Sequence, residues 1–312
     1  MKKYILKRCL YMFLTLFVII TITFFMLRSI PGDPLSSMAQ MLPEQTRANF
    51  YAKYGLDQPL FIQYLNYLKG LLHLDLGESV VFAGRSVSET IASTSPISGL
   101  VGGIALFFGV TIGIVLGIVA ALNKNKWPDY IVMFIAILGV TIPVFVLASL
   151  IQFVFAVKLN WLPTAGWGKP VHLILPVIVM SFGPIASYAR YIKSSLLDTL
   201  EQDYVLTARA KGLSEGKVIR RHVLRNSMLP AVTMLAGSVV GIFTGAFVTE
   251  KMFSIPGIGY YYVTSINNND YTMVMGTTIF YAILFIIMQL VVDFIYVLVD
   301  PRIRISNDEV KG

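Results

Sequence analysis

The sequence predicts an all-α integral membrane protein with six transmembrane helices. Only 13% of its 312 residues are charged, whereas an ordinary soluble domain is about one quarter charged. Its mean hydropathy is +0.71, and long apolar runs recur from one end of the chain to the other. A chain with so little polar surface does not face water on all sides, so we expect residues 1–312 to form a single transmembrane domain.

Six segments reach the length of about 20 apolar residues that a helix needs to cross a bilayer. They are 9–29, 97–122, 130–157, 171–192, 231–249 and 274–299. An even number of spans places both termini on one side of the membrane. Most Lys and Arg residues lie in the segments on the side of the N-terminus, so the positive-inside rule predicts that both termini are cytoplasmic.

The first apolar segment follows the basic stretch "MKKYILKR". Its apolar run is longer than that of a signal peptide and no clear cleavage site of small residues follows it, so we expect a retained anchor. The region 30–95 is then an extracytoplasmic loop. Within it, "PEQTRANFYAKYGL" and "PLFIQYLNYLKGLL" are typical of short amphipathic helices at the membrane interface.

Small residues and prolines mark particular places in the spans. The second span carries three glycines at four-residue spacing, which predicts close packing of another helix on that face: Gly109, Gly113 and Gly117. Three prolines predict bends or breaks in the third and fourth spans, either along a pathway or as ordinary packing kinks: Pro143, Pro176 and Pro184.

Four polar residues in or near the spans are candidate functional groups: Gln152, Arg190, Gln289 and Asp293. One alternative follows from Asp293, which would be the proton or sodium site of an ion-coupled secondary transporter. The three His residues are scattered and Cys9 is the single cysteine, so the pattern predicts neither a metal site nor a disulfide. We find no pattern of catalytic residues, and no cofactor is expected.

The most charged part of the chain is the segment 193–229, which we expect to be cytoplasmic. It holds seven of the 25 Lys and Arg residues, between Lys193 and Arg225. Gly212 separates two helix-forming stretches, and Ser214 with Glu215 supplies an N-cap and a first-turn acid for a helix from Glu215 to Asn226. The segment is therefore predicted to form a helix, a turn and a second helix.

The second of these helices has two different faces. Lys217, Arg221 and Arg225 recur every four residues, and a neighbouring apolar stripe consists of Val218, Ile219, His222 and Val223. An apolar stripe indicates docking, either onto a protein partner or back onto the spans, and anionic lipid headgroups are the alternative for the basic face. Because the spacing in "GLSEGK" departs from the P-loop pattern, this chain is not expected to bind nucleotide there.

This segment resembles the cytoplasmic loop of ABC-importer permeases. Leu206, Thr207 and Ala208 stand at the Glu-Ala-Ala positions of the family consensus, Gly212 matches its glycine, and "SMLP" at 227–230 matches its ending without the Ile. The combination of "ARAKGL" and "RHVLRN" is similar to the form in dipeptide and oligopeptide importers. Further family signatures run along the chain: "IPGDP" at 30–34, "YGLDQPLFIQY" at 54–64, "LDLGES" at 74–79, "LPTAG" at 162–166, "FSIPGIG" at 253–259, "VDFIY" at 292–296 and "DPRIR" at 300–304.

The resemblance is to the first, B-type permease of that pair, and it implies the type I ABC importer permease fold. It further implies a second homologous permease, two cytoplasmic ABC ATPases, an extracytoplasmic peptide-binding protein and peptide as substrate, in a bacterial cytoplasmic membrane. Nucleic acid is not an expected partner. This subunit would not be an enzyme, because ATP is hydrolysed by the partner subunits, and the pathway residues are not assigned.

In the family, the loop docks into a cleft of the ATPase. The resemblance therefore assigns this coupling role to ten residues: Leu206, Thr207, Ala208, Gly212, Leu213, Ser214, Val218, Ile219, His222 and Val223. A permease of the same family for nickel or another small solute is the second alternative. The scarcity of His and Cys disfavours a soft metal as the substrate.

Overall fold

The computed structural model describes residues 2–29, 48–49, 51–52, 55, 57–82 and 84–299, and every element in these ranges is a helix. The motifs at 30–34 and 300–304, most of the helix expected within 43–56, and the side chains of Cys9 and Asp293 lie outside the description. The described residues form two compact units, one of residues up to 96 with 257–286 and one of 97–256 with residues from 287. The expectation of a single domain stays a prediction.

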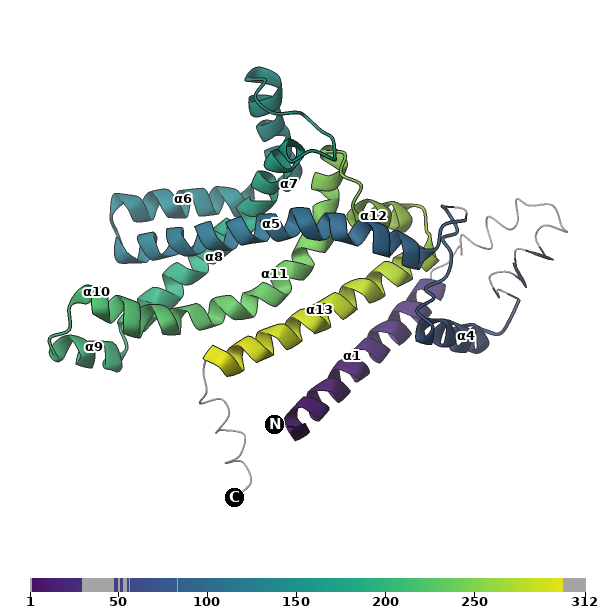
Figure 1. Ribbon diagram of the computed structural model, residues 1–312, viewed down its shortest axis with the longest axis horizontal. Coiled ribbons are helices and arrows are strands. Elements are labelled where there is room, and N and C mark those ends of the chain that lie inside the picture. The colour runs from purple at the N-terminus through teal and green to yellow at the C-terminus, as the bar shows by residue number, and fades with distance from the viewer. Residues whose placement is uncertain are drawn as a thin grey trace. The chain divides into compact units, whose positions relative to one another are not determined.

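The first unit is built around helix α1 (Lys2–Arg28), with α4 (Leu60–Leu72), α12 (Ile258–Asn267) and the first parts of α5 (Val87–Leu122) and α13 (Tyr271–Val299). Its core joins Phe24 and Leu27 of α1, Tyr64 of α4 and Met275 of α13; these three helices are labelled in Figure 1. The hydroxyls of Thr21 and Tyr64 lie 2.7 Å apart. Helix α4 matches the second helix expected in the loop, with Tyr64 buried and Phe61 exposed, and its location at the membrane interface stays a prediction.

Asp270 holds the loop before α5 against the start of α13. Its carboxylate is fully buried and accepts the amide of Met273, at 3.1 Å, in the first turn of α13. The same carboxylate accepts the Ser79 hydroxyl and the Val80 amide, the latter at 3.3 Å. A buried carboxylate needs several hydrogen-bond donors, so one side chain caps a helix and fixes a segment that lies about 190 residues earlier in the chain.

The second unit contains α6 (Trp127–Thr141), α7 (Val144–Ile151), the π-helical segment η1 (Gln152–Lys158), α8 (Val171–Leu200), the segments α9 to α11 and the remainder of α5. Helix α8 packs against α6, α7 and α11. The glycine face of α5 also lies on α8. A Cβ added to Gly113 would lie 2.9 Å from the Ile185 carbonyl oxygen, and one added to Gly117 would lie 2.7 Å from that of Ala189. The packing role of these glycines is confirmed.

Pro143 breaks the third expected span. Ile142 has extended backbone (ψ 121°), as is typical of a residue before proline, and the helices Trp127–Thr141 and Val144–Lys158 meet at 109°. Helix α6 rises about 22 Å at 1.5 Å per residue, which is less than the hydrocarbon core of about 30 Å. Pro176 and Pro184, by contrast, lie inside the uninterrupted helix α8, so the expected break occurs only at Pro143.

Four helices among the described residues are long and apolar enough to cross a membrane, and the bent pair would make a fifth. They are Leu10–Arg28, Val87–Leu122, Val171–Leu200 and Tyr271–Val292. The expected span 231–249 lies within α11 (Leu224–Met252), part of whose side chains fall outside the description. The count of six spans and the orientation stay predictions.

Two of these helices extend beyond their expected limits. Helix α5 begins at Val87 rather than near 97, and α8 continues to Leu200 rather than ending near 192. The polar start of α5 is compatible with a helix because the hydroxyls of Thr90 and Thr94 donate to carbonyl oxygens one turn back, at 2.8 and 2.7 Å. These hydrogen bonds satisfy the hydroxyls locally.

We predict that Gly113→Leu destabilises the protein, because the new side chain would meet the backbone of α8. Overpacking of this kind costs about 1–3 kcal/mol. Gly103→Leu on the same helix is the control, since a Cβ at Gly103 meets no described atom within 4 Å. Thermal melting of the purified protein in detergent measures the difference. Equal melting midpoints for the two variants would contradict the packing role of Gly113.

Candidate functional site

The charged segment has the predicted helix, turn and second helix. Helix α9 (Asp203–Ala210) follows α8, a turn covers 211–214, and α10 (Glu215–Val218) lies beside α9 (Figure 1). The second helix extends far beyond the expected end at Asn226. Helix α10, the π-helical segment η2 (Ile219–Val223) and α11 follow one another without a break from Glu215 to Met252, so the hairpin is continuous with a long helix of the unit.

Gly212 closes α9 with a left-handed residue. Its φ is +76°, a conformation that glycine adopts without steric cost. The amide of Gly212 donates to the Arg209 carbonyl at 2.9 Å and that of Leu213 to the Ala208 carbonyl at 3.4 Å, which are the two hydrogen bonds of a Schellman motif. Ser214 occupies the predicted N-cap position, but its side chain makes no capping hydrogen bond.

Three polar contacts that the sequence analysis missed fix the hairpin. The Arg209 guanidinium binds both carboxylate oxygens of Glu215, at 2.9 and 3.3 Å, and so joins α9 to α10. The Asn226 amide donates to the Tyr204 hydroxyl at 2.9 Å, and the Ser195 hydroxyl of α8 donates to the Ser227 carbonyl at 3.1 Å. Each contact joins residues of different helices, so no local sequence pattern indicates it.

Part of the predicted docking stripe is buried inside the chain. Val218 and Val223 are 0% exposed and Ala208 is 5% exposed. They pack with Val205 of α9 and Leu196 of α8 in one apolar cluster, which also includes Ala121 of α5. The sequence left two destinations open for the stripe, and its members Val218 and Val223 dock onto their own unit, as does Ala208. Ile219 and His222 are half-buried.

The π-helical segment explains why two positions five residues apart share the buried face. In an α-helix, Val218 and Val223 would differ by about 140° around the axis. In a π-helical turn, which bonds residues five apart, they lie on the same face, as residues four apart do in an α-helix. An interpretation based on the 3.6-residue period therefore places Ile219 and His222 beside Val218, whereas the structure buries Val223 more deeply than either.

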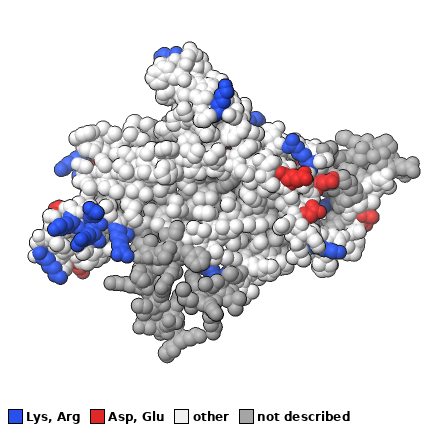
Figure 2. Space-filling view, viewed as in Figure 1, with Lys and Arg blue, Asp and Glu red and all other residues white. Residues whose placement is uncertain are grey.

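The exposed surface of the hairpin is formed by the other predicted residues and by basic side chains. Leu206 is 53% and Leu213 is 38% exposed, and Thr207, Gly212 and Ser214 are exposed as well. Lys and Arg side chains gather over this end of the unit (Figure 2), from a set of exposed residues: Arg209, Lys211, Lys217, Arg220, Arg221 and Arg225. Such a surface is complementary to a groove on another protein that is lined by acidic side chains and has space for Leu206 and Leu213.

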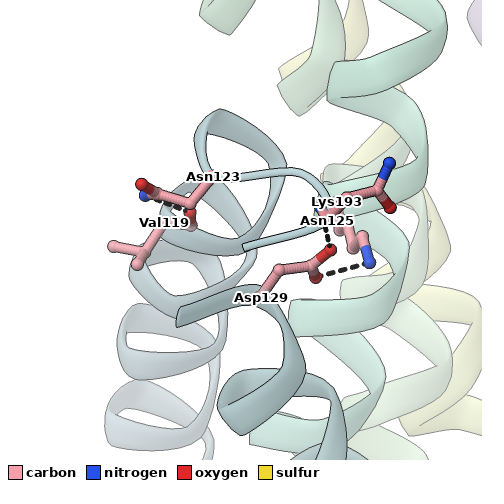
Figure 3. Close-up of polar contacts among 5 residues, drawn as sticks. All are labelled: Val119, Asn123, Asn125, Asp129 and Lys193. Atoms are coloured by element: carbon pink, nitrogen blue, oxygen red, sulfur yellow. Dashed lines mark hydrogen bonds and ion pairs between the residues drawn. The ribbon is translucent and has the colours of Figure 1, made fainter. Parts of the chain in front are cut away.

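An ion pair fixes α6 to α8 in the same unit (Figure 3). The Lys193 ammonium lies 2.5 Å from the Asp129 carboxylate, and the other carboxylate oxygen accepts a hydrogen bond from the backbone amide of Asn125 at 3.1 Å. Asp129 is buried, while the Lys193 side chain keeps 21% of its surface exposed. Lys193 lies one turn before Leu196 of the buried cluster, so the pair positions the part of α8 on which the hairpin packs.

The other polar candidates have ordinary environments where they are described. The Gln152 amide donates to the carbonyls of Thr164 and Met252, at 2.8 and 3.1 Å. Arg190 is exposed and Gln289 is half-buried. Within the ranges that the structure describes, no group of three or more His, Cys, Asp and Glu side chains is placed to hold a metal ion.

Two family models match this chain. Residues 113–305 match the model described as binding-protein-dependent transport system inner membrane component, and residues 1–97 match that of its N-terminal region. A dipeptide transport system permease protein, DppB, of Bacillus subtilis is 44% identical over 98% of this chain and 99% of its own length. An oligopeptide transport system permease protein, OppB, of Escherichia coli is 42% identical over 97% of this chain and 100% of its own length.

Two solved structures share the fold. A chain of the MetNI methionine ABC transporter has a TM-score of 0.54 and 16% identity, covering 68% of this chain and 96% of its own. A chain of an amino acid ABC transporter has a TM-score of 0.51 and 12% identity, covering 69% of this chain and 94% of its own. The expected importer permease fold is confirmed.

We predict that Asp129→Asn destabilises the protein by about 2 kcal/mol, because it leaves a partly buried ammonium without its counter-charge. The double variant Asp129→Lys with Lys193→Asp would recover part of the loss by restoring opposite charges. Thermal melting of both variants in detergent measures the effect. If Asp129→Asn melts like the unaltered protein, the ion pair does not stabilise the contact between α6 and α8.

Proposed function

This chain belongs to the family of binding-protein-dependent transport system inner membrane components, and we propose from this premise that it forms half of the translocation pathway of a peptide importer. It is a multi-pass protein of the cytoplasmic membrane with the fold of ABC-importer permeases. The proposed partners are a second homologous permease, two cytoplasmic ABC ATPases and an extracytoplasmic peptide-binding protein. The partners, not this chain, would bind and hydrolyse ATP.

The proposal that the substrate is a peptide rests on the likeness of this chain to DppB and OppB. Their identity to this chain exceeds 40% over nearly the full length of all three proteins. The nickel alternative gains no support from the described residues, which present no cluster of metal ligands. Ion-coupled secondary transport is not the mode of a binding-protein-dependent system, so family membership disfavours that alternative as well.

The α9–α10 hairpin is the proposed coupling element. Leu206 and Leu213 are exposed beside basic side chains, so they are suited to enter a cleft on an ATPase subunit. Ala208, Val218 and Val223 are instead packed on α5 and α8. A displacement of the hairpin would therefore be transmitted to the transmembrane helices by direct van der Waals contact, since packed interiors resist deformation.

We predict that Leu206→Glu and Leu213→Glu each weaken binding of the ATPase subunits at least tenfold, because a carboxylate would replace an apolar side chain in the cleft. Copurification from mild detergent and peptide-stimulated ATP hydrolysis measure the effect. Leu72→Glu is the control, since Leu72 is 85% exposed but belongs to α4. Unchanged copurification in both hairpin variants would contradict the coupling assignment.

Gly212→Trp tests the turn by a different physical effect. A side chain at φ +76° is strained, and the indole would project from the exposed turn into the proposed cleft. We expect the protein to remain in the membrane while uptake is lost. Normal uptake in this variant would count against a docked turn.

The substrate is tested by reconstituting the complete transporter with its binding protein in proteoliposomes that contain ATP. We expect uptake of radiolabelled di- and oligopeptides that stops without ATP and persists when ion gradients are collapsed by ionophores. Uptake of nickel but not of peptides would show that the substrate is nickel and not a peptide. Uptake that requires an ion gradient and no ATP would overturn the proposal of an ATP-driven importer.

A further inference from the structure

Two hollows in the second unit lie on different sides of α8 and differ in their lining. One, of about 490 Å³, lies between α5 and α8 and is lined mainly by large apolar side chains such as Phe108, Ile112 and Ile174. The other, of about 290 Å³, lies between α7, α8 and α11. Its wall combines glycines and hydroxyl side chains with apolar residues. The first group is Gly183, Ser187, Ser238, Gly241 and Thr249, and the second is Val144, Val179, Met180, Pro184 and Ile242. Only the first has the character of a site for lipid chains.

The glycines of the smaller hollow differ from those that pack helices. A Cβ at Gly109, Gly113, Gly117 or Gly139 would meet another helix at 3.1 Å or less. A Cβ at Gly183 or Gly241 meets no described atom within 4 Å, and neither residue has a positive φ. Glycine inside a helix is less stable than alanine, so neither packing nor backbone geometry explains these two residues. They leave space that any larger side chain would fill.

Hydrogen-bonding groups lie at the wall of the same hollow. Thr249 is fully buried, and its hydroxyl has no hydrogen-bond partner within the described part of the chain. Pro184 has no amide hydrogen to donate to the carbonyl of Met180, which also belongs to the wall. Such groups favour an occupant that carries its own donors and acceptors. A lipid chain or an apolar helix face would leave them unsatisfied.

No charged residue belongs to the described wall, so the hollow does not select an ion or a charged side chain. Two open glycines and three hydroxyl side chains among apolar residues suit an uncharged main chain whose side chains vary. We infer that this hollow is the part of the translocation pathway contributed by this subunit, that it takes peptide main chain, and that Gly183 and Gly241 set its width. The inference rests on the proposed function, which supplies peptide as the transported solute.

The test compares Gly183→Leu and Gly241→Leu with the control Gly103→Leu in the complete reconstituted transporter. A leucine in the wall narrows the passage, so uptake of triphenylalanine should fall at least tenfold while uptake of trialanine falls much less. The control should transport both peptides like the unaltered complex, because Gly103 is an open helical glycine outside this wall. Unchanged uptake of triphenylalanine in both wall variants would overturn the inference.

A second measurement covers the case in which the leucine variants fail to assemble. Cys9 is the single cysteine, so Cys9→Ser gives a background in which Ser187→Cys and Ser238→Cys are nearly isosteric probes. A small charged methanethiosulfonate should modify both variants and slow uptake, and peptide with ATP should change the rate of modification. Ile174→Cys, in the apolar hollow, should not react. Absence of reaction at both serine positions would overturn the inference.

These outcomes are distinguishable from failure of the proposed function. If the unaltered complex moves no peptide, peptide import is wrong. The thiol labelling then still decides whether the hollow is a hydrated passage, since labelling at Ser187→Cys and Ser238→Cys requires access of a charged reagent and not transport.

Discussion

Close approach of helix backbones on α8 is the constraint on which the second unit depends. Gly113 and Gly117 of α5 bring that helix to within van der Waals contact of carbonyl oxygens of α8, and Gly139 of α6 does the same from another side. Apolar side chains gain little by leaving lipid for a helix interface, so close packing of small residues supplies the attraction. Once α5 and α6 are fixed on α8, the ends of these helices determine where the α9–α10 hairpin lies.

The hairpin is joined to this framework more firmly than an exposed loop would be. The buried face of α9, α10 and η2 packs on α5 and α8, and the Asp129–Lys193 ion pair lies one turn from that cluster. The helical path also continues from Glu215 into α11 without interruption. A force applied at the exposed turn therefore has two routes to the spans, one through side-chain packing and one along the backbone. In the proposed importer, closure of the ATPase subunits would displace the hairpin, and these contacts would transmit the displacement to the helices that line the smaller hollow.

The glycines of α5, α8 and α11 show that one residue type serves opposite purposes in the same membrane protein. Gly113 has no side chain, so two backbones can touch there, whereas the lack of a side chain at Gly183 and Gly241 leaves open space. Local conformation does not distinguish them, because all three are helical. The surrounding atoms do. They form a packing face around Gly113, whereas Gly183 and Gly241 belong to a wall that includes the Thr249 hydroxyl, which has no hydrogen-bond partner within the described part of the chain.

The sequence by itself determined the features that depend on neighbours along the chain: the apolar helices, the break at Pro143, the turn at Gly212 and the helical pattern on both sides of it. The sequence predicted only some of the residues that pack inside the hairpin, because the prediction assumed the 3.6-residue period of an α-helix and the π-helical turn has a longer one. Only the tertiary structure decided that Val218 and Val223 face inward while Leu206 and Leu213 face outward. It also decided that Asp270 fixes Ser79, far away in the chain, and that Gly183 is open while Gly113 is covered. These outcomes depend on contacts between distant segments, and helix propensity and hydrophobic periodicity contain no information about which distant surfaces meet.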